Sequence, residues 1–308
     1  MHNLDKSIEF PAVSILILNW NGAADTLECL DSLKKIDYPS YEIIVVDNSS
    51  SGDDVNIIKS KCNDSVTVIK NDQNLGFAEG NNVGIRYILA NRESKYIFLL
   101  NNDTTVKVDF LSQLVKVAEA DSSIGMVGPE IHLYDRPEKI HSRGGVINLY
   151  TGWHFVGGSF HRPPYNDDSK FILNYYSGAA VMIRTEVIKK VGAFDPDYFY
   201  YTEDVDLGYR IFRAGYKIVC ARKSIIYHKE GRSVGGNIRN PKTAYFETRN
   251  ALLFVRKHGR WCHLMVFVPV LLLKMVYDLL KFFPDEKKVL GSRLRGLWWH
   301  VTNRRNNL

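Results

Sequence analysis

The sequence predicts an α/β fold built on a mostly parallel sheet flanked by helices, followed by a C-terminal helical basic extension. Through the first 120 residues, short apolar runs rich in β-branched side chains alternate with segments of helical periodicity. Strands that are buried on both faces have this composition. Their alternation with helices is typical of parallel sheets with right-handed crossovers. Beyond residue 240 the pattern is helical and basic.

Four strands and four helices are expected in this first part of the chain. The helices are predicted from apolar residues three or four positions apart, such as Leu27, Leu30 and Leu33. The expected strands cover residues 13–18, 42–46, 66–69 and 96–100. The expected helices cover residues 24–36, 53–61, 77–90 and 108–120.

The second part of the body is less regular. Residues 132–170 are rich in glycine, histidine and aromatic residues, which predicts mixed strand and loop. A helix near residues 203–214 and a strand near 224–227 close the body, and the chain is helical from residue 241 on.

Polar residues stand where three of the expected strands end. They are Asn19, Asp47 and the run Asn101, Asn102 and Asp103. Ligands of open α/β sheets bind outside the carboxyl ends of the strands. These tips therefore predict a binding site at one edge of the sheet.

Three further features can carry chemistry, and each also has a purely structural interpretation. Asp103 could bind a divalent cation or simply form a turn. Glu203 and Asp204 open a helix, so they could cap it or provide a general base. His228 ends a strand, as a surface residue or as a metal ligand.

The order of these segments resembles the inverting glycosyltransferases of family 2, which have the GT-A fold, and especially their bacterial rhamnosyltransferase-like branch. The matching strings run in the expected order from residue 13 to about residue 236. They are VSILILNWNG (13–22), IVVDNSS (44–50), NLGFAEGNN (74–82), FLLNND (98–103), SGA (177–179), GAFD (192–195), TEDVDL (202–207), and His228 with the glycines Gly231, Gly235 and Gly236.

The resemblance implies a nucleotide-sugar site. Asn19 would border the nucleobase and Asp47 would hydrogen-bond it. The ribose would lie near Asn101, where the family often has the first Asp of its D-x-D motif. The other implied donor-binding residues are Asn74, Gly76, Asn81 and Asn102, and Gly178 and Ala179 would line the sugar site.

The resemblance also implies the reacting groups. Asp103, the last position of the D-x-D motif, would bind Mn²⁺ or Mg²⁺, and His228 would complete the metal or diphosphate site. Asp204 would be the catalytic base, supported by Glu203. One displacement would invert the anomeric centre, by the logic of inverting glycoside hydrolases. The departure at Asn101 removes one charge and puts metal affinity in question.

The expected reaction is transfer of a single sugar. The Q-x-x-R-W string of processive relatives is absent, since the only glutamines are Gln73 and Gln113. The branch suggests dTDP-rhamnose as donor, with UDP-sugars open. The acceptor would be a saccharide or a lipid-linked saccharide.

The C-terminal extension predicts a membrane contact. Residues 229–308 carry 16 Lys and Arg against 5 Asp and Glu, whereas residues 1–228 carry 24 against 29. The apolar run 264–273 is shorter than the ~20 residues that span a bilayer. Lys274, Asp278 and Lys281 share one side, which favours a helix lying in an anionic interface. Packing on the body or a homodimer contact is the alternative.

Location follows from the same features. No apolar leader opens the chain, and no pair of its four cysteines has C-x-x-C spacing, which fits a reducing compartment. We therefore expect a cytoplasmic protein, peripheral on the inner face of the cell membrane. Trp298, Trp299, Arg293 and Arg295, with Arg304 and Arg305 beyond, suit the depth of lipid headgroups.

The expected domains are a catalytic domain over residues 1–238, with a nucleotide-sugar half at 13–130 and an acceptor half at 131–238, and a tail at 239–308.

A dinucleotide oxidoreductase would need G-x-G-x-x-G after the first strand, and a nucleotidyltransferase would need a glycine-rich basic loop there. Both are missing. A nucleic-acid-binding function would not explain the acidic residues at the ends of the predicted strands. A non-catalytic sugar-nucleotide-binding homologue stays open.

Overall fold

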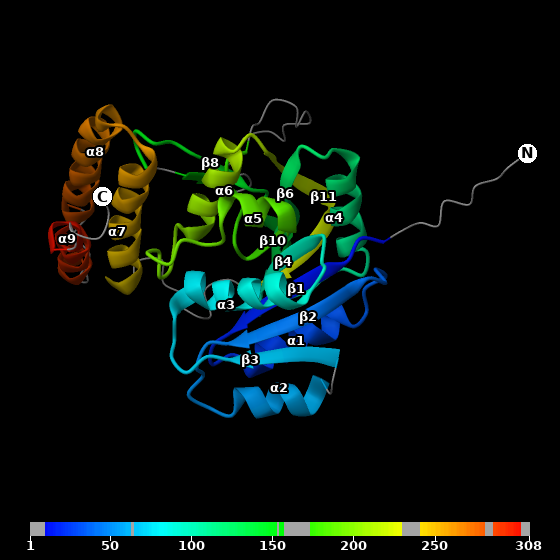
Figure 1. Cartoon of the computed structure of the whole chain (residues 1–308). Helices are drawn as coiled ribbons and strands as arrows, with labels where there is room; N and C mark the ends of the chain where they lie inside the picture. The colour runs from blue at the N-terminus through cyan, green and yellow to red at the C-terminus, as the bar shows by residue number, and fades with distance from the viewer. Residues whose placement is uncertain are drawn as a thin grey trace, which may run out of the picture.

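The computed structural model describes residues 10–62, 65–152, 154–156, 173–229, 241–280 and 286–302. Over these residues the protein has a nine-stranded sheet flanked by helices and a separate two-stranded sheet. A group of helices, α7 to α9, stands beside the sheet (Figure 1). The strand order of the main sheet is β3-β2-β1-β4-β10-β6-β11-β5, and β7 pairs with β6.

The first half of the sheet confirms the predicted alternation. Its parallel strands are β1 (Val13–Asn19), β2 (Tyr41–Asp47), β3 (Val66–Lys70) and β4 (Tyr96–Asn101). The connecting helices are α1 (Ala23–Leu33), α2 (Asp54–Cys62) and α3 (Gly76–Asn91). Because β1, β2 and β4 are buried almost throughout, their apolar runs fill the core of the sheet.

The second half of the sheet is mixed, which the sequence did not predict. β10 (Ala180–Arg184) runs antiparallel to both β4 and β6 (Ile124–Leu133). β11 (Lys217–His228) pairs with β6 in parallel and is longer than the predicted strand. The remaining elements here are α4 (Phe110–Ala120), β7 (Arg136–Ser142), β8 (Gly145–Ile147), β9 (His154–Val156), α5 (Thr185–Val191) and α6 (Glu203–Arg213).

A three-residue strand, β5 (Thr104–Val106), lies between β4 and the predicted helix that follows it, where the sequence analysis assigned no element. It pairs antiparallel with β11, so that Thr104 faces His228. Three residues are too few to show the alternating pattern from which a strand is predicted. It has a large effect on the site, because it fixes Asp103 against the end of β11.

The C-terminal extension consists of α7 (Pro241–His258), α8 (Trp261–Leu280) and α9 (Glu286–Thr302). A second apolar cluster joins α7 and α8 to α6, through residues that include Val205, Tyr209, Phe254 and Phe267. Of the helices that the structure describes, none has the length and apolar character needed to cross a bilayer.

Two residues that the sequence assigned to headgroup depth lie elsewhere. Arg293 is only 8% exposed, and its guanidinium lies near the Thr248 hydroxyl. The ring of Trp299 lies under the Arg249 guanidinium, 4.3 Å from ring centroid to Cζ. Both residues therefore pack α9 against α7. Trp298 and Arg295 are exposed, and Arg304 and Arg305 lie outside the described residues.

Candidate active site

The polar tips of β1, β2 and β4 do meet at one edge of the sheet. β1 lies between β2 and β4, and the chain order reverses direction between β1 and β4. Such a switch point is where open α/β sheets bind ligands. Asn102 reaches the β1 side of this edge, since its amide donates to the Thr26 hydroxyl at 3.1 Å.

Asn19 and Asp47 form a buried network beneath this edge. Both are completely buried, and the Asn19 amide donates to Asp47 Oδ1 at 2.8 Å and to Asp54 Oδ2 at 3.0 Å. The Ser50 hydroxyl also donates to Asp47 Oδ1, at 2.6 Å. In this structure Asp47 therefore braces the loops after β1 and β2, and its contact with a base stays a prediction.

Asn48 is a residue that sequence reasoning missed. Its side-chain amide donates to Asn74 Oδ1 and to the Gly76 carbonyl, each at 3.0 Å, and its Oδ1 accepts from the Leu75 amide at 3.1 Å. Asn48 thus holds the turn into α3 that carries Asn74 and Gly76. Its place in the matched string 44–50 was the only available signal.

The start of α3 is also tied to the second half of the chain. Gly76 has a φ of +79°, and the next amide, of Phe77, donates to the Phe199 carbonyl at 2.8 Å. Asn81, 2% exposed, donates to the Phe77 carbonyl at 2.9 Å. The predicted nucleotide-binding residues of α3 thus lie next to the loop that precedes α6.

Asp103 and His228 form a pair across the β5–β11 ladder. His228 Nε2 lies 3.1 Å from Asp103 Oδ1, and the two side chains are about one-tenth exposed or less. The Lys229 amide also donates to the Asp103 carbonyl at 3.0 Å. Burial alone would raise the pKa of Asp103, but the hydrogen bond and charge of His228, with the charge of Lys229, hold it below its usual value.

The pair fits a divalent cation as two ligands of a larger set. A carboxylate and an imidazole are suitable donors for Mn²⁺, and the His228 Nδ1 is buried without a hydrogen-bond partner. Within the described ranges, no group of three or more His, Cys, Asp and Glu is arranged to hold a metal. Other ligands would come from a bound diphosphate and water, as is usual for Mg²⁺ with phosphate substrates. Gly231, Gly235 and Gly236 lie outside the described residues.

Asp204 is fixed next to the predicted sugar site. Its Oδ2 accepts from the Gly178 amide at 2.9 Å, and its Oδ1 accepts from the Val205 amide at 2.8 Å. The carbonyl of Ala179, beside Gly178, accepts from the Asn101 amide at 2.8 Å. Because β10 runs antiparallel to β4, these contacts bring the start of α6 to the strand end that carries Asn101.

Glu203 is buried, and its Oε2 has no hydrogen-bond partner. Burial and the neighbouring charge of Asp204 raise its pKa well above the usual value of a glutamate. Two adjacent carboxyls with such different surroundings are typical of acid–base sites. The turn before them is unusual, because Tyr201 and Thr202 both have positive φ, at 69° and 74°.

Tyr200 lies in the turn that precedes the acidic pair and is within electrostatic reach of Asp103. Burial raises its pKa most, and the charges of Tyr201, Glu203 and Asp103 raise it further. A surface cavity of about 680 Å³, lined by residues such as Ser94, Lys95 and Glu186, lies instead at the amino end of β4.

A mainly parallel sheet, with an Asp–His pair at the carboxyl end of β4 and an acidic pair opening α6, is the arrangement expected of a GT-A glycosyltransferase. A family profile described as "Glycosyltransferase like family 2" matches residues 11–261. Since this match covers well over half of the chain, the protein belongs to that family.

Curated relatives agree with this assignment. The chain is 28% identical over 235 residues to the O-antigen biosynthesis protein RfbC of Myxococcus xanthus, a match that covers 72% of this chain and 18% of that protein. It is 26% identical over 175 residues to the N-acetylglucosaminyl-diphospho-decaprenol L-rhamnosyltransferase of Mycobacterium tuberculosis, covering 54% of this chain and 57% of that enzyme. It is 26% identical over 235 residues to rhamnosyltransferase WbbL of Escherichia coli, covering 72% and 86%.

Solved structures share the fold. The mannosyltransferase PcManGT of Pyrobaculum calidifontis, in complex with GDP-Man and Mn²⁺, superposes with a TM-score of 0.58 at 15% identity, and the match covers 98% of this chain and 77% of that one. GalNAc-T7 with UDP, GalNAc and Mn²⁺ superposes with a TM-score of 0.66 at 16% identity, covering 96% and 57%.

Proposed function

We propose that the protein transfers a single sugar from a nucleoside diphosphate to a saccharide or lipid-linked saccharide, with inversion at the anomeric carbon. The observation that carries this proposal is the hydrogen bond between the Gly178 amide and Asp204, beside the strand end that leads to Asp103. This hydrogen bond puts a carboxylate next to the predicted sugar site, where an acceptor hydroxyl would have to lose its proton.

In this reaction the acceptor oxygen attacks the anomeric carbon as Asp204 takes its proton. The bond from that carbon to the diphosphate breaks, and the diphosphate leaves with the bonding electrons. Asp103 and His228 would hold Mn²⁺ or Mg²⁺, which would offset the charge that builds on the leaving group. Glu203 supports Asp204 from the buried side.

The donor is proposed from the relatives. Two of them are named rhamnosyltransferases, so dTDP-rhamnose is tested first, and UDP-sugars follow. A panel of sugar nucleotides is screened for Mn²⁺-dependent thermal stabilisation and for hydrolysis. A donor class that stabilises the protein only with Mn²⁺ is the expected result.

The base is tested with Asp204→Asn, which should retain nucleotide binding and abolish transfer. Glu186→Gln is the matched control, because Glu186 is an exposed carboxylate in the first turn of α5. Transfer at the parental rate by Asp204→Asn would exclude Asp204 as the base. Loss of nucleotide binding together with activity would indicate a structural role.

We further propose that α8 docks on an anionic membrane surface. Large apolar side chains cover a continuous exposed side of this helix, and the most exposed are Trp261, Met265 and Leu273, at 74%, 65% and 68%. Burial of Phe267, Leu271 and Met275 fixes which side faces the protein. Lys274 is exposed at the edge of the apolar side, and the basic charge of the extension complements anionic lipid.

Co-sedimentation tests this contact with vesicles of phosphatidylcholine, with and without phosphatidylglycerol. We expect binding that needs phosphatidylglycerol and that falls at least tenfold in Met265→Glu combined with Leu273→Glu. Val108→Glu is the control, because Val108 is 54% exposed on the body of the protein. Dimers in solution that the double variant dissociates, without vesicle binding, would assign the surface to a second copy instead.

A further inference from the structure

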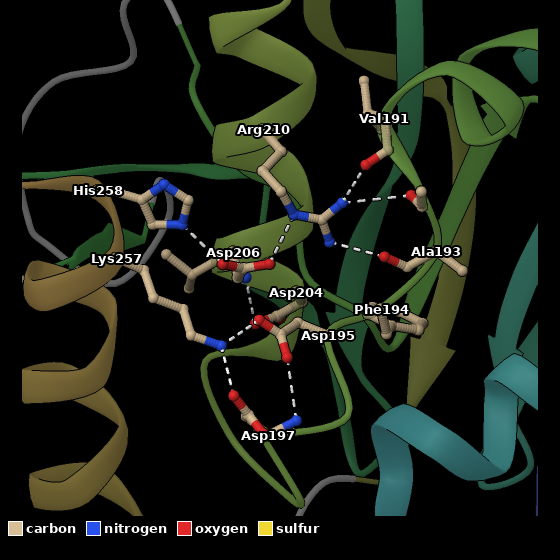
Figure 2. A network of polar contacts seen from close by, with 12 residues as sticks. Val191, Ala193, Phe194, Asp195, Asp197, Asp204, Asp206, Arg210, Lys257 and His258 are labelled. Atoms are coloured by element: carbon tan, nitrogen blue, oxygen red, sulfur yellow. Dashed lines mark hydrogen bonds and ion pairs between the residues drawn. The ribbon is translucent and has the colours of Figure 1, made fainter. Parts of the chain in front are cut away.

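The first helix of the C-terminal extension contacts the segment that leads into the acidic pair of α6. Side chains of α7 reach this segment at several successive points from Asp195 to Asp206. Lys257 Nζ donates to the carboxylates of Asp195 and Asp197, at 2.5 and 2.7 Å. His258 Nε2 lies 2.7 Å from Asp206 Oδ1. Figure 2 shows Lys257 and His258 pointing from α7 toward these carboxylates.

Asp206 and Arg210 extend this network to the other side of α6. Arg210 Nε donates to Asp206 Oδ2 at 2.8 Å, and its terminal nitrogens donate to the carbonyls of Val191 and Ala193, each at 2.7 Å (Figure 2). Burial would raise the pKa of Asp206, but the hydrogen bond from His258 and the charge of Arg210 hold it below its usual value. The helix that carries Asp204 is thus held from two sides.

Asn250 contacts the turn that directly precedes the acidic pair. Its side-chain amide donates to the Tyr200 carbonyl at 2.8 Å and to the Tyr201 carbonyl at 2.7 Å, and the residue is completely buried. These two carbonyls belong to the turn in which Tyr201 and Thr202 have positive φ. Residues with a Cβ avoid that region unless their surroundings enforce it.

We infer that Asn250 is a positioning residue for catalysis: its amide holds the left-handed turn at Tyr201 and Thr202, and this turn aims Asp204 at Gly178. The inference rests on the proposed function, since Asp204 is the proposed base. Asn250 itself is distant in sequence from every residue that the family resemblance assigned to the site. Without its amide, the turn would relax toward negative φ and turn the first residues of α6 away from Gly178.

The test compares Asn250→Ala with the parent in steady-state transfer and in binding of the nucleoside diphosphate. We expect kcat to fall at least tenfold, while KM for the donor and the affinity for the nucleotide change less than twofold. Asn91→Ala is the matched control, because Asn91 also donates its amide to a backbone carbonyl, of Tyr87 at 2.8 Å, but on the exposed end of α3. That variant should keep the parental kcat.

A rescue separates positioning from general stability. Thr202→Gly removes the Cβ that disfavours positive φ, so it should restore part of the lost kcat in Asn250→Ala and have little effect alone. A parental kcat in Asn250→Ala, or a double variant no better than the single one, would overturn the inference. If Asn250→Ala does not fold, Asn250→Ser decides, because its hydroxyl can serve one carbonyl: an intermediate kcat supports the inference and an unchanged kcat overturns it.

Amide hydrogen exchange provides a readout that does not depend on transfer. In the parent, the hydrogen-bonded amides of Val205 and Asp206 should exchange slowly, and Asn250→Ala should speed their exchange at least tenfold relative to α4. If the parent transfers no sugar from any donor, the proposed function fails, whereas unchanged exchange in Asn250→Ala would reject the role of Asn250 in holding the turn.

Discussion

A Cβ atom on Gly76 would lie only 2.4 Å from the carbonyl oxygen of Phe199. This closeness comes from the contact that joins α3 to the loop before α6, through the Phe77 amide and that same carbonyl. The start of α3 and the loop before α6 therefore meet at a point that accepts glycine alone.

Gly76→Ala should consequently destabilise the protein and weaken nucleotide binding. Gly215→Ala is the matched control, because Gly215 has a similar φ of +89°, but a Cβ added there would have no neighbour within 4 Å. The left-handed conformation alone costs about 1–2 kcal/mol, which is what we expect for Gly215→Ala. Chemical denaturation should show a larger loss for Gly76→Ala, and equal losses would contradict this account.

Under the proposed function Mn²⁺ should stabilise the protein in the presence of a nucleoside diphosphate, and Asp103→Asn should abolish this stabilisation. The amide keeps the shape of the side chain but lacks the charge that a hard cation requires. Thermal melting with and without Mn²⁺ measures the effect, with Asp109→Asn as control at the start of α4. A parental Mn²⁺ response in Asp103→Asn would remove Asp103 from the metal site.

Glu203→Gln should raise the melting temperature at neutral pH. Because burial and the charge of Asp204 raise the pKa of Glu203, the folded state retains a proton that the unfolded chain releases. The stability that this carboxyl provides is present below its unfolded pKa and is lost as pH rises. The melting temperature of the variant should therefore change less between pH 5 and pH 8 than that of the parent. A lower melting temperature across this range would argue that Glu203 is ionised in the fold.

Mild acid should loosen α9 from α7. Burial lowers the pKa of His300 to about 4, and its Nε2 lies 2.7 Å from the Arg249 carbonyl. A depressed pKa of this kind supports the fold above the unfolded value of about 6.5, and that support is lost as pH falls toward 4. His300→Asn should reduce the loss of stability between pH 6.5 and pH 4, whereas His263→Asn should not. An unchanged pH profile in His300→Asn would show that another group controls it.

The sequence alone predicted the parallel half of the sheet because each strand there is a continuous apolar run. It predicted neither β5, which is three residues long, nor β10, whose five buried residues do not reveal that the strand runs antiparallel to its neighbours. The same limits apply to the site. Asp103 and His228 were chosen by resemblance, but their pairing depends on β5 lying against β11.

Asn48, Asp54 and Asn250 were not predicted, because each acts through hydrogen bonds to backbone or to other buried polar groups. An asparagine within a helical pattern such as that of α7 is not distinguished by its sequence. Only the three-dimensional contacts separate Asn250, which is completely buried, from an asparagine such as Asn91, which is exposed.

The contacts of α7 decide where chimeric proteins in this family can be joined. The family match runs to residue 261 and so includes α7. An exchange of C-terminal segments between relatives would keep the Asn250 amide under the Tyr200 and Tyr201 carbonyls only if the junction falls after Asn250, and would keep all of these α7 contacts only if it falls after His258. A graft made at residue 239 would give the recipient a foreign helix α7, and with it foreign contacts to the turn that precedes Asp204.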